Sequence, residues 1–427
     1  MTEPAPVRDI GGDVARRAPF GHPVVSERGS ATRRHILEAT IEVLAEVGFE
    51  AARVEEVAER AGCSRPTFYQ YFSSKHDVFW ALATALGEEI VALANRLEPL
   101  GPGAEGVERL ADWIDEFMDL HRRWQPVFAS FQAASRDHLP QARRSTTVSL
   151  RTDRALLDAF GVAGDRFQER LMGTLFAVLD RSSFYMSQDV PDADARPLEV
   201  ALAELFHRAV LGPIDGVNLH RGRRPARRQI ALPRLKASPL DPLPPRQEAT
   251  RRKLLDAGRQ VLPSRGYQDS RVDDIVSAAG VSHGTFYRYF ESKDQFFQVL
   301  AEGAALRAVA LVERLDLTAP DDELRAWVVD WMHAYRDDGG IISVWQEMHT
   351  NVGLGRFSRA VAASMFSALV DRLERRDFGN PEPDATSLLA LLERLPNNVY
   401  TLGFTTEADG IEIMVTILRR GYLGVDV

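Results

Sequence analysis

The sequence is short of the residues and runs that mark several classes of protein. It contains one cysteine, Cys63, which excludes an intrachain disulfide framework and a zinc site built from cysteines. No uninterrupted run of 18 or more apolar residues occurs, so the sequence predicts no transmembrane helix. The N-terminal residues also lack the apolar core of a signal peptide. We therefore expect a cytoplasmic protein without a membrane partner.

Signatures of catalysis are missing as well. We find no paired carboxylates, phosphate-cradling glycine loop, nucleophile motif or HExxH metal motif, so neither an enzyme, a metal site nor a cofactor is predicted. Positive charge is scarce overall, since the formal net charge is −9. Net charge is an average over the molecule, however, and DNA binding depends on where the basic residues lie. They gather at residues 33–34, 221–228 and 251–253, which leaves DNA binding open.

Helical periodicity is what the sequence has in abundance. Apolar residues follow the spacing of amphipathic helices through most of the chain, which predicts an all-α fold. Near the C-terminal end we expect separate helices at 321–337 and 341–352, on either side of Gly339 and Gly340. Residues 221–247 interrupt the pattern with six prolines and eight arginines or lysines, as a semi-extended linker does. This linker acts either as a spacer or as a strap on DNA phosphates.

The helical pattern contains an internal duplication. Residues 32–82 match residues 250–300 without a gap at an offset of 218, and 22 of the 51 positions are identical. A repeat of this length indicates a duplicated structural unit. The second copy has Pro263 where the first has Ala45, near the end of the first helix of the unit. We expect this proline to shorten or kink that helix.

Each copy contains two short predicted helices around a tight turn, at residues 53–72 and 271–290. Gly62 suits the positive φ of such a turn, and Ser64 is expected to cap the helix that follows. This arrangement is a helix-turn-helix, whose second helix lies in the major groove of DNA. We therefore assign the polar and basic residues of that helix and its flanks to DNA binding. These candidates are Arg53, Ser64, Arg65, Pro66, Thr67, Tyr69, Gln70, Tyr71, Lys75, Ser282, His283, Gly284, Thr285, Tyr287, Arg288, Tyr289 and Lys293.

The candidates divide by whether the two copies share them. Shared residues suit phosphates, because a phosphate contact carries no sequence information. The positions that differ are Arg65/His283, Pro66/Gly284 and Gln70/Arg288. Arginine reads guanine and glutamine reads adenine, so we expect the two helices to read different half-sites. Phe68 and Phe286 fall on the opposite face, where we expect them to be buried.

The two copies resemble the DNA-binding domain of the tetracycline-repressor (TetR) family of bacterial regulators. The resemblance rests on Thr32-Arg33, Ile36-Leu37-Glu38-Ala39, Gly48-Phe49, Ala61-Gly62 and Ser64-x-x-Thr67-Phe68-Tyr69-x-Tyr71-Phe72-x-x-Lys75, nearly all of which recur between Thr250 and Lys293. It implies two tandem TetR-like units, each a three-helix head followed by a helical-bundle body. The implied divisions are a mobile arm at 1–29, a head at 30–90, a body at 91–220, the linker, a second head at 248–308 and a second body at 309–427.

The resemblance also implies function and partners. The leading hypothesis is a transcriptional repressor that binds double-stranded operator DNA and responds to a small apolar effector held in a body. Two heads in one chain imply an intramolecular pseudo-dimer on an imperfect palindrome, or alternatively a homodimer of tandem chains. The alternative function is a regulatory or interaction protein in which one head, the second, has lost DNA binding. Candidate pocket residues, which suit a plain core as well, are Trp124, Phe128, Phe131, Phe176, Trp345, Met348 and Met365.

Overall fold

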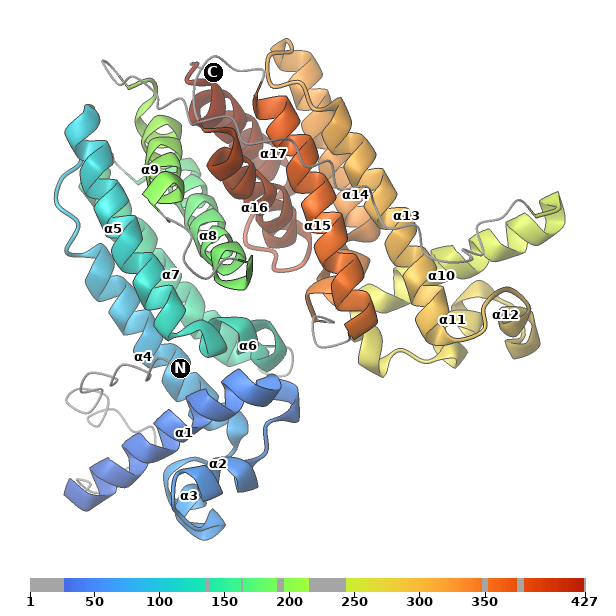
Figure 1. The fold of residues 1–427 in the computed structure, drawn as a ribbon, viewed down its shortest axis with the longest axis horizontal. Helices are drawn as coiled ribbons and strands as arrows, with labels where there is room; N and C mark the ends of the chain where they lie inside the picture. Colours follow the sequence, from blue (N-terminus) through green and yellow to red (C-terminus); the bar gives the residue numbers. More distant parts are fainter. Residues whose placement is uncertain are drawn as a thin grey trace. The chain divides into compact units, whose positions relative to one another are not determined.

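A computed structural model describes residues 27–135, 139–162, 164–189, 196–214, 243–347, 352–374 and 380–425. Every regular element in these residues is a helix, which confirms the predicted all-α fold (Figure 1). The chain divides into two compact units. The first takes in the described residues of Met1–Gly101, Glu105–Gly173 and Ser183–Glu199. The second takes in Pro102–Ala104, Thr174–Ser182 and the described residues of Val200–Val427.

The helices follow the duplication. Those of the first copy are α1 (Glu27–Ala51), α2 (Val54–Arg60), α3 (Arg65–Tyr71), α4 (Lys75–Ala94), α5 (Ala104–Arg123), α6 (Gln125–Ser135), α7 (Leu139–Phe160), α8 (Arg166–Asp189) and α9 (Arg196–Leu211). Those of the second copy are α10 (Pro245–Asp269), α11 (Val272–Ala279), α12 (His283–Tyr289), α13 (Lys293–Arg314), α14 (Asp321–Glu347), α15 (Val352–Leu373), α16 (Pro381–Tyr400), α17 (Glu407–Thr416) and the π-helix η3 (Ile417–Leu423).

Local sequence accounts for the ends of the head helices. Gly62 closes α2 with a φ of 66°, a left-handed conformation that costs glycine little, and Gly280 closes α11 with a φ of 63°. Ser64 Oγ then accepts a hydrogen bond from the Thr67 N–H at 3.2 Å and caps α3. The predicted turn and the predicted serine cap are both present.

Three helix boundaries differ from the sequence prediction. Helix α10 ends at Asp269, the equivalent of Ala51 where α1 ends, so Pro263 does not shorten it. Helix α10 also begins at Pro245, inside the predicted linker, because a proline in the first helical turn lacks only an N–H that would have no helical partner. Helix α1 likewise begins within the predicted arm, at Glu27. The rest of the arm, and residues 215–242 of the linker region, lie outside the described residues.

Helix α14 is one continuous helix where two were predicted. It runs through Gly339 and Gly340 without a break. Each glycine in a helix interior costs about 1 kcal/mol relative to alanine. Helix α14 packs against α10, α13, α16 and α17, and these tertiary contacts outweigh the local cost. One helix therefore reaches from the second body to the second head.

The two bodies bury equivalent aromatic pairs. In the first body, Trp113 donates its indole N–H to the carbonyl oxygen of Leu93 at 3.0 Å and stacks on Phe117. In the second body, Trp327 donates to Leu311 at 2.8 Å and stacks on Trp331. These matching bonds establish the structural register between α5 and the first part of α14.

In the second unit, the Thr174–Ser182 segment of α8 lies against α16. Arg181 Nε donates to Glu393 Oε2 at 2.9 Å, and Arg394 Nη2 donates to Asp180 Oδ2 at 3.0 Å. The side chains of Arg181 and Glu393 are 9% and 11% exposed, so this ion pair is largely buried from solvent. In each pair, an acid from one copy of the duplication meets an arginine from the other.

The reciprocal pairing reflects matching sequences on the two helices. LFAVLDR at residues 175–181 corresponds to LLALLER at residues 388–394. A second contact joins the two copies in this unit. Arg208 of α9 donates from Nε to the carbonyl oxygen of Gly421 in η3 at 2.7 Å. A Cβ on Gly421 would come within 2.6 Å of a methyl carbon of Leu205, so a larger residue at this position would require the Leu205 side chain to move.

Helix α13 has the length and composition of a membrane span, but half of its most apolar 18-residue window is buried inside the protein. That degree of burial is what a core helix shows. It packs against α14, α15 and α10. Among the described residues no other helix meets the same length and hydropathy criteria.

The buried Asp153 of α7 makes the stability of the first body depend on pH. This carboxyl is 6% exposed, its Oδ1 has no hydrogen-bond partner among the described residues, and Oδ2 lies where a Cβ on Gly173 would be 3.1 Å away. Burial, and next the negative charge of Glu169, raise the pKa of Asp153 to about 8. Between about pH 4 and pH 8 the unfolded chain releases this proton while the folded chain keeps it, so stability falls as pH rises through that window.

We therefore expect Asp153→Asn to flatten this pH dependence and to raise stability at pH 8 by on the order of 2 kcal/mol. Thermal unfolding of the wild type and the variant at pH 5, 6.5 and 8 measures the effect. Asp158→Asn, which changes an exposed carboxyl on the same helix, is the control. Equal pH slopes for the wild type and Asp153→Asn would contradict the expectation.

Candidate nucleic-acid interface

The two candidate recognition helices, α3 and α12, are built alike. Each has seven residues, begins after a serine cap and ends at an extended phenylalanine, Phe72 or Phe290. Ser282 Oγ accepts from the Thr285 N–H at 3.3 Å, as Ser64 does from Thr67 in the first copy. The sequence prediction that both copies form a helix-turn-helix is confirmed at the level of the backbone.

Neighbouring aromatic residues on these helices face opposite ways. Phe68 and Phe286 are fully buried, whereas Tyr69 and Tyr287 are 48% and 54% exposed. Phe286 lies 5.5 Å from Phe290 between ring centroids, within the core of the second head. The exposed tyrosines keep their rings and hydroxyls available for contact with a partner. The predicted division into core phenylalanines and surface tyrosines is confirmed by their burial.

The remaining candidates that the two copies share lie on or near the same surfaces. Ser64 and Ser282 are exposed, and each hydroxyl lies 2.9 Å from that of the threonine three residues later, Thr67 or Thr285. These hydroxyls cap the helices and keep acceptor or donor capacity for a phosphate. Tyr71 and Tyr289 are half-buried, and Arg53 is exposed at the cap position of α2. Their roles in DNA binding remain predictions.

At the first position that differs between the copies, each basic side chain meets an acid. Arg65 Nη2 lies 2.7 Å from Glu55 Oε1, and His283 Nε2 contacts Asp273 Oδ1. Glu55 and Asp273 are equivalent residues of α2 and α11, so the same contact recurs in both heads. To reach a base, Arg65 or His283 must leave its acidic partner. Sequence reasoning missed this contact, although the acid stands ten residues before the basic residue in both copies.

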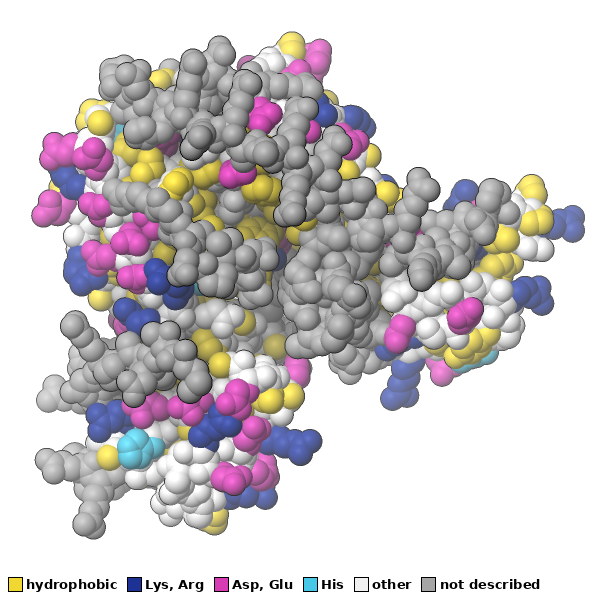
Figure 2. Space-filling model, viewed as in Figure 1, with side chains coloured by type: hydrophobic (Ala, Val, Ile, Leu, Met, Phe, Trp, Pro, Cys, Tyr) yellow, Lys and Arg dark blue, Asp and Glu magenta, His cyan; other side chains and the backbone are white. Residues whose placement is uncertain are grey.

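The side chains at the other two differing positions are exposed to solvent. Pro66, Gln70, Gly284 and Arg288 are all exposed. On the face of the first head seen in Figure 2, Lys and Arg side chains lie among Asp and Glu side chains. In the same head, Arg60 Nη1 and Nη2 each donate a hydrogen bond to a carboxylate oxygen of Glu46 at 2.7 Å. The heads therefore present mixed charge, and Gln70 and Arg288 keep the polar groups that read base edges.

Lys75 is already engaged inside its own head. Its ammonium donates to the carbonyl oxygens of Phe49 and Glu50 at 3.0 Å and of Ala52 at 3.4 Å. An ammonium has three donors, so in this conformation all three are used on the end of α1. Lys293 similarly donates to the carbonyl oxygen of Ser270 at 3.0 Å. The predicted phosphate contact stays a prediction. In the structure, Lys75 links the start of α4 to the end of α1 through these hydrogen bonds.

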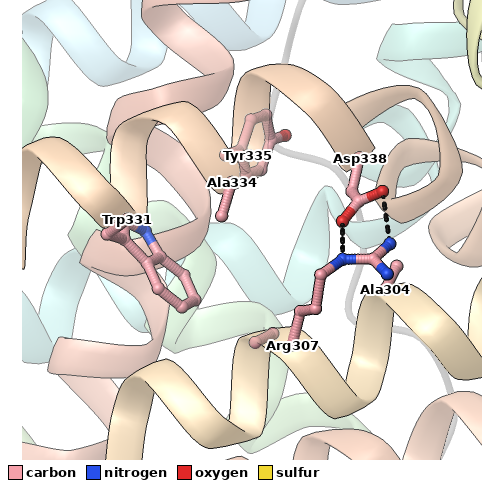
Figure 3. A pocket seen from close by; sticks show the side chains of 7 residues that line it. Ala304, Arg307, Trp331, Ala334, Tyr335 and Asp338 are labelled. Carbon is pink, nitrogen blue, oxygen red and sulfur yellow. Dashed lines mark hydrogen bonds and ion pairs between the residues drawn. The ribbon is translucent and has the colours of Figure 1, made fainter. Parts of the chain in front are cut away.

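The second body contains a pocket between α13 and α14. It is lined by Ala304, Arg307, Ala308, Trp331, Ala334, Tyr335 and Asp338 (Figure 3). Its volume is about 10 Å³, which is room for about one water molecule. None of the pocket residues predicted from the sequence lines this pocket.

The predicted pocket residues have other surroundings. Trp124 is buried and donates its indole N–H to Glu89 Oε2 at 3.3 Å. Phe128 stacks on His121, and Phe131 packs edge-on against Trp80. Phe176 is half-buried in α8, and Met365 is buried in α15. The side chains of Trp345 and Met348 lie outside the described residues. Their assignment to a ligand pocket remains a prediction.

Comparison with known proteins agrees with the two heads. The family model "Bacterial regulatory proteins, tetR family" matches residues 36–82 and again residues 254–300. Two solved structures of tetR-family regulators, one from Streptomyces coelicolor and PfmR from Thermus thermophilus, are similar to 42% and 41% of this chain. Their TM-scores are 0.35 and 0.34 at 19% and 18% sequence identity, and this chain covers 81% and 96% of theirs.

Curated relatives match part of the chain. The chain is 39% identical over 71 residues to the uncharacterized HTH-type transcriptional regulator YwcC of Bacillus subtilis, which is 17% of this chain and only 32% of that protein. It is 24% identical over 171 residues to the HTH-type transcriptional activator FasR of Mycolicibacterium smegmatis, covering 37% of this chain and 74% of FasR. It is 30% identical over 144 residues to the HTH-type transcriptional repressor Rv1474c of Mycobacterium tuberculosis, covering 30% of this chain and 74% of that repressor. With both heads matched by the family model, the chain belongs to the tetR family of bacterial regulatory proteins.

Proposed function

We propose that this regulator is an effector-responsive repressor whose two heads read the two half-sites of one imperfect palindrome. As a member of its family the chain is a DNA-binding transcriptional regulator and not an enzyme. Its relatives include both a named repressor and a named activator, so the direction of regulation is part of the proposal. We further propose that it acts in the cytoplasm, on double-stranded DNA.

The observation that supports this function best is the reciprocal pairing of α8 with α16. Asp180 meets Arg394 while Arg181 meets Glu393, and these residues occupy equivalent places in the two copies. Such an exchange, in which position i contacts j and j contacts i, is the mark of a two-fold symmetric interface. This pairing supports a pseudo-dimer, in which a single chain presents both heads.

The asymmetry of the heads supports the imperfect palindrome. Three exposed positions differ between two otherwise similar recognition helices, and they carry chemically different groups: Arg65/His283, Pro66/Gly284 and Gln70/Arg288. Arginine prefers guanine and glutamine prefers adenine, so Gln70 and Arg288 favour different bases at the same place in each half-site. A homodimer has identical heads and no such means of reading an asymmetric site.

Footprinting tests whether both heads bind DNA. We expect Tyr69→Ala and Tyr287→Ala each to weaken binding to a site selected from random duplexes by about 10-fold to 100-fold, the range for loss of a hydrogen bond to a charged group. Each variant should lose protection over one half-site while the other half-site stays protected. Because both tyrosines are exposed, the fold should be unchanged, and circular dichroism checks this. If neither substitution affects DNA binding, the proposed interface is wrong.

The same experiment distinguishes the proposed function from the alternative, in which the second head does not bind DNA. If Tyr69→Ala abolishes binding while Tyr287→Ala has no effect, the second head is an interaction module and not a DNA reader. If light scattering on the complex finds two chains per site, each palindrome is read by a dimer of tandem chains.

Half-site preference is tested by making the second recognition helix resemble the first. In the triple variant His283→Arg, Gly284→Pro, Arg288→Gln, we expect the selected site to change from an imperfect to a perfect palindrome. Each mismatched base pair costs about 1–3 kcal/mol, so the variant should prefer the perfect site over the original by at least about tenfold. Glu291→Ser, at another exposed position that differs between the copies just after α12, is the control. An unchanged selected sequence would show that these three residues do not read bases.

A further inference from the structure

A single buried carboxylate joins three helices of the second unit. Asp338 of α14 is 4% exposed. Its Oδ2 accepts a hydrogen bond from Arg307 Nε at 2.8 Å, and its Oδ1 accepts one from Arg307 Nη2 at 2.7 Å (Figure 3). Arg259 Nε lies 3.3 Å from the same Oδ1. The acid on α14 is therefore shared by an arginine of α13 and an arginine of α10.

The two arginines connect Asp338 to different parts of the unit. Arg307 lies in the later part of α13, one helical turn before Leu311, whose carbonyl oxygen accepts the indole N–H of Trp327 in α14. This ion pair therefore joins two helices that are already bonded to each other in the body. Arg259 lies on α10, which is the first helix of the second head and packs against α14. Its ion pair with Asp338 links the head to the body.

An ion pair fixes the position of a helix more closely than apolar packing does. The hydrophobic effect has no preferred direction, so two apolar faces can slide or rotate against each other. The attraction between two named charges, in contrast, weakens as they separate. Because Asp338 is buried, moving Arg259 away from it costs free energy that water does not return. The pair therefore holds α10 at one place along α14.

The position of α10 is passed to the recognition helix through the core of the head. Gly258, next to Arg259, lets α10 approach α13 closely, since a Cβ there would come within 2.6 Å of the Phe296 ring. The Phe296 ring centroid lies 5.4 Å from that of Phe286, the buried phenylalanine of α12. Helix α11 packs against both α10 and α12. Because these helices share one core, the place of α10 sets the place of α12.

The first head is not linked to its body in this way. In the first copy the places of the two arginines and the acid are taken by Ile41, Glu89 and Trp124. Ile41 carries no charge, and Glu89 accepts a hydrogen bond from the Trp124 indole N–H at 3.3 Å. The ion pair between the first helix of a head and the body is therefore a property of the second copy.

We propose that Asp338 is a positioning residue for DNA reading by the second head. Through Arg259 it holds α10, and with it α12, in the place from which the second half-site is reached. This inference rests on the proposed function, in which the two heads bind one palindrome. It adds that the second head is fixed to its body by a buried charge, whereas the first head is attached without this ion pair.

The spacing between the half-sites tests the inference. The probes are the site selected by the wild-type chain and two duplexes with one base pair inserted or removed between its half-sites, which moves them by about 3.4 Å. We expect the wild-type chain to bind the altered duplexes at least about tenfold more weakly, because fixed heads cannot engage both half-sites together. In Arg259→Gln this preference should fall to about threefold or less, while binding to the original site weakens about tenfold because the head is ordered only on DNA.

Arg307→Gln is the matched control, since it removes an arginine from the same carboxylate but leaves the link to α10 in place. It should lower the thermal stability of the chain, because Asp338 loses a partner, and it should keep the wild-type preference for spacing. Arg259→Gln leaves Arg307 on Asp338 and should keep the fold, which circular dichroism checks. Footprinting of Arg259→Gln should show weaker protection over the second half-site and unchanged protection over the first.

An unchanged spacing preference in Arg259→Gln, or an equal loss of preference in Arg307→Gln, would overturn the inference. So would a wild-type chain that binds the altered duplexes as tightly as the original site. A wild-type chain that protects neither half-site would overturn the proposed function as well. Two protected half-sites with no effect of Arg259→Gln would overturn this inference alone.

Discussion

Phe286→Ala is expected to destabilise the second head by about 3–5 kcal/mol, the usual cost of removing a buried phenylalanine ring. Phe286 is fully buried, and its ring centroid lies 5.4 Å from that of Phe296 and 5.5 Å from that of Phe290. Removing it leaves a cavity at the place where α12 meets α13, in a head with a small core. Hydrogen–deuterium exchange of residues 271–290 measures the loss as faster exchange of this region.

Tyr287→Ala is the matched control, because it removes the neighbouring aromatic ring from an exposed position. It should leave exchange in residues 271–290 almost unchanged, with an effect within about 0.5 kcal/mol on stability, while it weakens DNA binding. The two variants thus separate the packing face of α12 from its contact face. Equal protection in Phe286→Ala and wild type would mean that the head does not depend on this aromatic core.

Arg181→Glu is expected to cost about 3–5 kcal/mol in the stability of the second unit, as breaking a buried ion pair does. The substitution places a glutamate against Glu393 in a site where the two original side chains are 9% and 11% exposed. It also sets a second acid next to Asp180, which needs Arg394 as its partner. Urea unfolding followed by tryptophan fluorescence measures the loss, with Trp331 held against α16 through the carbonyl oxygen of Leu392 as one reporter.

The double variant Arg181→Glu, Glu393→Arg restores opposite charges and should recover at least half of the lost stability. Arg325→Glu is the control for an exposed pair and should cost about 1 kcal/mol or less, since Arg325 and Glu412 are 44% and 50% exposed. An effect of Arg181→Glu no larger than that of Arg325→Glu would show that α8 and α16 are not held by this pair. That result would also remove the main support for the pseudo-dimer.

The heads were predictable because each step that forms them is local in sequence. The serine caps, the positive-φ glycine and the helical stripe of apolar residues lie within about twenty positions of one another, and each acts on the backbone beside it. The duplication presents the same signals a second time, in the same order and at the same spacing. Burial of Phe68 and Phe286 followed from helical periodicity alone.

Contacts between side chains at the heads were less predictable. The sequence spacing predicts that Lys75 and Arg65 are basic residues near DNA. It does not predict that Lys75 donates to three carbonyl oxygens or that Arg65 forms an ion pair with Glu55. A long flexible side chain chooses among several nearby partners, and the choice depends on distances that only the folded backbone sets. The expected shortening of α10 at Pro263 did not occur, because the packing of the helix outweighed the local preference of proline.

The sequence by itself determined the two heads, the all-α fold and the family, since these depend on short-range patterns that recur in both copies. Only the tertiary structure decided which residues meet across the bodies. Arg181 and Glu393 are far apart in the chain, and Arg259, Arg307 and Asp338 come from three helices. Helical periodicity says which face of a helix is buried, but not which charged side chains from distant helices share it. That pairing arises when the helices pack, because a charge removed from water must find its partner there.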